Sequence, residues 1–146
     1  MENGISLEVI WFDEVEDLLE VVFKCTNGYF SGYAEMYVTS YELSKLAKAL
    51  SGFPPRPDDF RDFELGTLNP KHADGGARMH FYCSDAAGHA VVDVKLRGSA
   101  CNGVGEIESV ALRMPIQAAA VDNFVQQLMA IGKTVGASAF LQQAKS

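Results

Sequence analysis

The segment from Gly75 to Gly98 alternates apolar and polar residues on both sides of the turn DAAG, and this constrains the fold more than any other feature. Apolar residues stand at 79, 81 and 83 before the turn and at 90, 92, 94 and 96 after it. Successive side chains of a strand point to opposite faces, so the segment predicts an antiparallel hairpin with one dry face. A one-residue slip would expose the apolar set, so the register should pair 83 with 90, 81 with 92 and 79 with 94.

The same hairpin carries two of the three histidines, and its register limits the chemistry they can perform. His80 and Cys83 are three residues apart and point to opposite faces, so they cannot bind one metal ion. The register places His80 opposite Asp93, a pair that can orient an imidazole for base catalysis but is more often structural. We therefore expect no catalytic residue, metal or cofactor. A small hydrolase-like enzyme using His80 and Asp93, or His89 or Cys101, is the alternative.

The three cysteines lack the spacing of a zinc site, which predicts free thiols in a reducing compartment and no disulfide. Cys25 and Cys83 fall on apolar faces, whereas Cys101 is expected to be exposed in a glycine-rich hairpin tip. Whether Cys101 is reactive depends on positive charge nearby. The loop residues His72 and Asp74 leave a site of two or three metal ligands open, should that loop fold over the hairpin.

The rest of the chain predicts five further strands and two helices, over residues 1–146 as a single domain. The strands are expected at 6–12, 17–25, 29–38, 62–68 and 108–116. A capping box at Thr39 and Glu42 opens the first helix, and Gly52 ends it. An apolar stripe predicts the second helix over 117–131, ending at Gly132. We expect an α+β fold with a mainly antiparallel, curved sheet of about six to seven strands and both helices packed on one face.

Acidic residues are concentrated in the N-terminal half of the chain. Residues 1–66 contain 13 acidic and 5 basic residues, within a net charge of −7 for the whole sequence. This balance disfavours a phosphate backbone as a partner and favours a basic one, although acidity that serves solubility alone is the alternative. The sequence shows no apolar run of membrane-spanning length and begins with acidic residues rather than a signal peptide, so we expect a cytoplasmic protein without nucleic-acid or membrane partners.

Tyrosine and arginine side chains are predicted to gather on the sheet face that points away from the helices. Both residue types are enriched at the centres of protein interfaces, although β-propensity and solubility also favour them on a half-open sheet. If one sheet carries all these strands, a single exposed face binds a protein partner. The predicted partner-binding residues are Tyr29, Tyr33, Glu35, Tyr37, Arg78, His80, Tyr82, Asp93, Lys95 and Arg97.

The layout resembles the WapI-type immunity proteins of bacterial polymorphic toxin systems over about residues 17–132. The resemblance is carried by Phe30-Ser31-Gly32-Tyr33-Ala34, by the leucine pattern from Leu43 to Leu50, by the strand pair HFYCSDAAGHAVVDV and by Asp122-Asn123-Phe124 through Leu128. It implies a cytoplasmic antidote that binds and blocks a cognate toxin, often a nuclease, and needs no cofactor. The Pro-rich segment PPRP and the loop KHADGGA depart from the pattern, and no toxin contacts can be carried over. A homo-oligomeric accessory domain, for example a homodimer through the tyrosine-bearing face, is the alternative.

Overall fold

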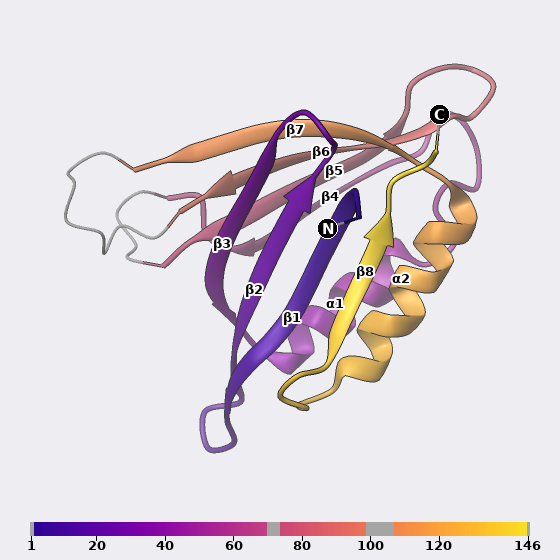
Figure 1. Ribbon diagram of the computed structural model, residues 1–146. Helices are drawn as coiled ribbons and strands as arrows, with labels where there is room; N and C mark the ends of the chain where they lie inside the picture. The colour runs from indigo at the N-terminus through magenta and orange to yellow at the C-terminus, as the bar shows by residue number, and fades with distance from the viewer. Residues whose placement is uncertain (1, 70–73, 99–106, 146) are drawn as a thin grey trace.

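The computed structural model describes residues 2–69, 74–98 and 107–145, which form eight strands and two helices (Figure 1). No helix in these ranges is long and apolar enough to cross a membrane. In chain order the elements are β1 Gly4–Asp13, β2 Leu18–Thr26, β3 Ser31–Val38, α1 Ser40–Leu50, β4 Phe60–Gly66, β5 Gly76–Cys83, β6 Ala90–Arg97, β7 Ser109–Ile116, α2 Ala118–Ile131 and β8 Ser138–Gln142.

The strands form two antiparallel sheets of four strands each, not one sheet of six to seven. Sheet A has the order β3-β2-β1-β8, and sheet B has the order β4-β5-β6-β7. The α+β class and the antiparallel pairing were predicted correctly. The division into two sheets was not, because α1 separates β3 from β4 and the second run of hairpins forms a sheet of its own. Local alternation specifies the two faces of a strand but not which sheet it joins.

The structure confirms the register predicted for the hairpin of β5 and β6. Cys83 lies opposite Ala90, Phe81 opposite Val92 and Met79 opposite Val94. Met79, Phe81 and Val92 are fully buried in the core, whereas Cys83 at the end of β5 is only partly buried. The apolar face of this hairpin is therefore the inner face of sheet B.

Strand β8 was missed by the sequence analysis, which placed no strand after residue 132. It pairs antiparallel with β1, with Leu141 opposite Ile5 and Ala139 opposite Leu7. Only Ala139 and Leu141 of its five residues are buried. Two apolar positions are too few to distinguish a short strand from a loop.

The two helices close the open side between the inner faces of the sheets (Figure 1). Helix α1 contacts β4 of sheet B, α2 contacts β8 of sheet A, and the helices contact each other. The capping interaction predicted for α1 is present, because the Thr39 hydroxyl accepts a hydrogen bond from the Glu42 backbone N–H at 3.0 Å. At the other end of α1, the Arg61 guanidinium donates to the carbonyls of Ala49 and Ser51. One hydrophobic cluster joins both sheets and both helices.

Strand β3 approaches the strands of sheet B so closely that the contact needs glycines. The Gly75 N–H donates to the Glu35 carbonyl at 3.1 Å and so joins the edge of sheet A to the start of β5. A side chain at Gly32 would place its Cβ 2.5 Å from Val110 and 2.8 Å from Leu96. The Asn27 side-chain amide adds a second link, because it donates to the Arg113 carbonyl of β7 at 2.9 Å.

We expect Gly76→Ala to lower the free energy of unfolding by about 2 kcal/mol or more, because overpacking a tight site forces the backbone to move. The new Cβ would lie only 2.1 Å from the Thr67 carbonyl oxygen. Gly98→Ala is the matched control, since its Cβ would meet its nearest atom at 3.7 Å. Urea denaturation of both variants measures the difference, and equal stabilities would contradict the prediction.

Candidate partner-binding faces

The predicted partner-binding residues are divided between two outer faces. Tyr33, Glu35 and Tyr37 point outward from β3 on sheet A. The predicted residues of β5 and β6 belong to sheet B. The inner faces of the two sheets share one core, so their outer faces lie on opposite sides of it, and the prediction of a single common face was wrong. Tyr29 lies in the turn before β3 and is 89% exposed.

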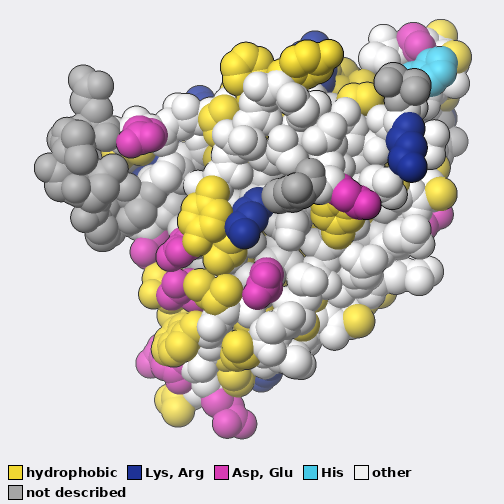
Figure 2. All heavy atoms as spheres, in the orientation of Figure 1, with side chains coloured by type: hydrophobic (Ala, Val, Ile, Leu, Met, Phe, Trp, Pro, Cys, Tyr) yellow, Lys and Arg dark blue, Asp and Glu magenta, His cyan; other side chains and the backbone are white. Residues whose placement is uncertain are grey.

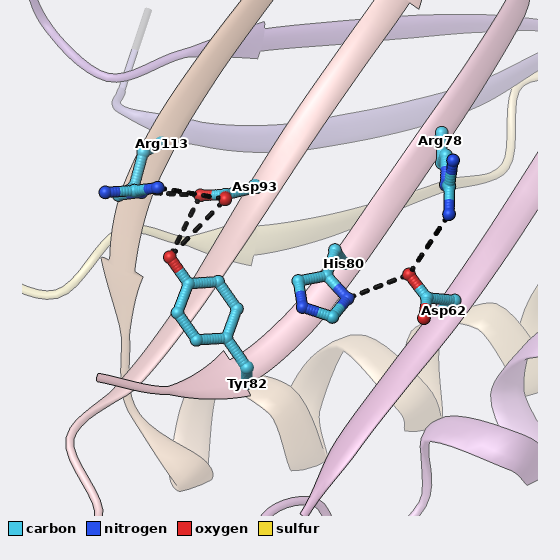
Figure 3. A network of polar contacts seen from close by, with 6 residues as sticks. All are labelled: Asp62, Arg78, His80, Tyr82, Asp93 and Arg113. Atoms are coloured by element: carbon cyan, nitrogen blue, oxygen red, sulfur yellow. Dashed lines mark hydrogen bonds and ion pairs between the residues drawn. The ribbon is translucent and has the colours of Figure 1, made fainter. Parts of the chain in front are cut away.

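On the outer face of sheet B, four charged or titratable side chains stand in one cross-strand row, Asp62, His80, Asp93 and Arg113 (Figure 3). His80 lies opposite Asp93 as predicted, but its Nδ1 contacts Asp62 Oδ1 at 2.8 Å instead. Asp93 accepts hydrogen bonds from Arg113 Nε at 2.7 Å and Nη2 at 3.2 Å. The predicted His80–Asp93 contact is therefore replaced by two separate pairs.

Tyr82 and Arg78 extend this row into a network (Figure 3). The Tyr82 hydroxyl donates to Asp93 at 3.3 Å, and its ring stacks on His80 with the ring centroids 4.9 Å apart. Burial, and then the charge of Asp93, raise the pKa of Tyr82. Arg78 Nη2 lies 3.8 Å from Asp62 Oδ1. Asp62 thus faces Arg78, and Asp93 faces Arg113. The contacts with Asp62 and with the Tyr82 ring hold the His80 imidazole in one orientation.

A shallow hollow of about 330 Å³ lies beside this network on the outer face of sheet B. Ala111 is the smallest side chain of its cross-strand row, opposite Lys95, and leaves the space that longer neighbours surround. The side chains around it are Arg78, His80, Asp93, Lys95, Ala111 and Arg113.

Arg97 was predicted on the solvated face, but the structure buries it. Only 3% of its surface is exposed. Its guanidinium donates to the Thr67 carbonyl at 2.8 and 3.0 Å, to the Gly98 carbonyl at 3.1 Å and to the Asp74 carbonyl. The segments around Thr67 and Asp74 cover the end of β6, which alternation within β6 does not reveal. Arg97 therefore links loops and is not available to a partner.

The outer face of sheet A combines exposed aromatic rings with glutamates, and we call it the acidic face. In one row Tyr37, Glu20 and Trp11 stand side by side, and the rings of Trp11 and Tyr37 meet edge to face with centroids 6.2 Å apart. Figure 2 shows acidic and hydrophobic side chains gathered along the β3 edge and the β1–β2 turn. The acidic face comprises Glu8, Trp11, Glu20, Val22, Lys24, Tyr33, Glu35 and Tyr37.

Trp11 reaches the acidic face because β1 contains a bulge. Val9 lies opposite Val21 and points into the core, but Trp11 lies opposite Glu20, so the register shifts between them. If Ile10 were an ordinary strand residue rather than the extra residue of the bulge, strict alternation would turn Trp11 inward with Val9. The sequence analysis missed Trp11, because a bulge leaves no reliable signal in an alternating pattern. It also did not include Glu8, Glu20 and Lys24, although their strands alternate regularly at these positions.

Glutamates of the acidic face raise the pKa of both of its tyrosines. The Tyr33 hydroxyl donates to Glu35 Oε1 at 2.6 Å, and this bond raises the pKa of Tyr33. A hydrogen bond to Glu20 is the main reason that the pKa of Tyr37 is raised. Lys24 Nζ lies 5.6 Å from the centre of the Tyr33 ring, within the range of a cation–π contact.

The described thiols lie in surroundings that disfavour the reactive thiolate. Burial raises the pKa of Cys25 to about 12, and desolvation with nearby aspartates raises the pKa of Cys83.

His89 Nδ1 contacts Asp85 at 2.7 Å in the hairpin turn, and this bond lowers the pKa of Asp85. Among the described residues, no three His, Cys, Asp or Glu side chains are grouped to hold a metal ion. The predicted loop residues His72 and Cys101 lie outside the described ranges.

We expect Arg97→Ala to lower the free energy of unfolding by about 2 kcal/mol or more, because hydrogen bonds from a charged group are each worth roughly 1.5–3 kcal/mol. Lys95→Ala, two residues earlier on the same strand but exposed, should change stability by less than about 0.5 kcal/mol. Chemical denaturation compares the two, and an Arg97→Ala variant as stable as Lys95→Ala would contradict the buried role.

His80→Ala should leave the free energy of unfolding within about 1 kcal/mol of the wild-type value, because exposed ion pairs contribute little to stability. The His80 and Asp62 side chains are 39% and 41% exposed. Thermal denaturation at neutral pH measures this change. If the free energy of unfolding fell by several kcal/mol, the network would contribute substantially to the stability of sheet B, which would contradict the prediction.

Comparison with known proteins identifies no relative. A scan against protein-family models finds no match, and searches of curated proteins and of solved structures find none either. The resemblance to WapI-type immunity proteins therefore enters the functional argument only as a proposal.

Proposed function

We propose that this chain is a non-enzymatic binding protein that uses the acidic face of sheet A against a basic protein partner. The observation that carries the proposal is the coincidence of three glutamates with three exposed aromatic rings on that face. Protein interfaces draw most of their binding energy from a few aromatic and arginine anchors, and charge complementarity selects among partners.

The charge of the acidic face supports a basic partner. Glu8, Glu20 and Glu35 project from neighbouring strands, against a single lysine, Lys24. The β1–β2 turn at the end of this face adds further carboxylates. The negative electrostatic potential of these carboxylates accelerates association with a positively charged protein and disfavours negatively charged partners. The acidic residues of that turn are Asp13, Glu14, Glu16 and Asp17.

The aromatic side chains supply apolar surface for a partner to bury. Trp11 is 44% exposed, Tyr33 54% and Tyr37 38%. An isologous homodimer through this face would bring the same glutamates toward one another, and like charges placed together are repulsive. The acidic face therefore favours a partner of different charge over a second copy of this chain.

The resemblance to WapI-type immunity proteins suggests a specific partner, a cognate toxin domain with a basic surface. Nuclease toxins fit this description, because they must bind a phosphate backbone. In this proposal the chain acts in the cytoplasm of the toxin-producing cell. It blocks the toxin by contact, and the proposal assigns no chemistry to the network on sheet B.

The test is co-expression of the chain with the product of the reading frame beside its gene, which the proposal expects to carry a toxin domain. We expect restored growth and a 1:1 complex. Tyr33→Ala and Tyr37→Ala should weaken that complex at least about tenfold, the cost of losing an interface anchor, while changing unfolding free energy by less than about 1 kcal/mol. Lys95→Ala on sheet B is the matched control and should bind as the parent does.

Three results would contradict the proposal. Continued toxicity together with no complex would remove the antidote function. A complex weakened by Lys95→Ala, but not by the tyrosine variants, would move the binding surface to sheet B. Equal losses in binding and in stability for the tyrosine variants would make these residues structural.

A further inference from the structure

The row of Trp11, Glu20 and Tyr37 places one carboxylate between two exposed aromatic side chains. Glu20 stands between the two aromatic residues on the middle strand of the three. The rings are nearly perpendicular, with an interplanar angle of 89°. A carboxylate flanked by aromatic rings offers charge pairing and cation–π attraction to the same positive group.

Two rows away on the acidic face, Lys24 lies opposite Tyr33, and there the chain itself supplies a cation to an aromatic ring. There Lys24 Nζ lies 5.6 Å from the centre of the Tyr33 ring, and the Tyr33 hydroxyl donates to Glu35. In the row of Trp11, Glu20 likewise lies opposite an exposed tyrosine, Tyr37. Among the described residues, no lysine or arginine lies over the Trp11 or Tyr37 ring, so a cation at this row would come from another molecule.

The bulge in β1 is a second, independent feature of this row. The register shift at Ile10 turns Trp11, the one tryptophan of the sequence, from the core side to the outer face. An indole of this size would otherwise add buried apolar area to the core. Bulges commonly re-aim a side chain at a functional site, and here the bulge places the best cation–π acceptor beside Glu20.

We propose that Trp11, Glu20 and Tyr37 form a seat for an arginine side chain of a protein partner. This inference rests on the proposed function and specifies how the acidic face recognises its partner. A guanidinium suits the seat better than an ammonium, because it is planar, stacks on aromatic faces and bonds a carboxylate through two N–H groups. A lysine would use only its point charge.

The seat can be tested without the partner, because the emission of Trp11 reports on its own surroundings. The probe is the tripeptide acetyl-Gly-Arg-Gly-amide, titrated at low salt, and its control is the same peptide with neutral citrulline. We expect a saturable change in emission with a dissociation constant on the order of millimolar, as two weak surface interactions allow. The citrulline peptide should leave the emission unchanged.

Two matched variants separate the seat from the general field of the acidic face. Glu20→Gln and Glu8→Gln remove the same charge from the same face, but Glu8 lies in another row, opposite Val22 and Ser138. We expect Glu20→Gln to raise the dissociation constant of the arginine peptide about fivefold or more. Glu8→Gln should raise it less than twofold. Circular dichroism checks that both variants remain folded.

If the two variants weakened binding of the arginine peptide equally, the seat would be overturned, because binding would then depend only on the overall charge of the acidic face. An equal response to the citrulline peptide would overturn it as well. The outcomes also separate the seat from the proposed function. A toxin complex that is insensitive to Glu20→Gln removes the seat and leaves the antidote function standing, whereas peptide binding without any toxin complex leaves the seat and removes the antidote.

Discussion

The close approach of β3 to sheet B is the contact on which the rest of the structure depends. Two sheets and two helices share one core only because the edge of sheet A lies against the strands of sheet B. Glycines make this possible: Gly32 leaves room for Val110 and Leu96, and Gly75 donates a backbone hydrogen bond to β3. Larger residues there would separate the sheets and open the cluster to water.

The division into two sheets gives the protein two outer surfaces with different electrostatic character. On sheet B, Asp62 lies beside Arg78 and Asp93 beside Arg113, so the charges of that network largely cancel. On sheet A the glutamates outnumber the single lysine, and the aromatic rings lie among them. The resulting asymmetry would orient an approaching basic protein toward sheet A before any contact forms.

Local periodicity predicted the elements well, because it reflects the same alternation that packs each strand. The register of the β5–β6 hairpin, the capping of α1 by Thr39 and the buried stripe of α2 followed from residues close together in the sequence. The division into two sheets did not, because it depends on contacts between β3 and strands of sheet B that lie far away in the sequence.

The candidate site was predicted in part for the same physical reason. Tyr33, Glu35 and Tyr37 share an outward face as alternation requires. The bulge at Ile10 reverses the alternation, so Trp11 was missed, and a distant loop covers Arg97, so an apparently solvated position is buried. The partner of His80 is Asp62 from β4 rather than Asp93, because a cross-strand row offers an imidazole a neighbour on each side.

The pairing of β1 with β8 has a consequence for the order of folding during synthesis. Strand β1 lies inside sheet A, yet one of its edges is filled only by residues 138–142. While the ribosome makes the intervening segment, that edge exposes unsatisfied backbone groups, which invite pairing with other nascent chains. Rapid closure by β8 after its release, or a chaperone that shields β1 until then, would protect the protein from aggregation.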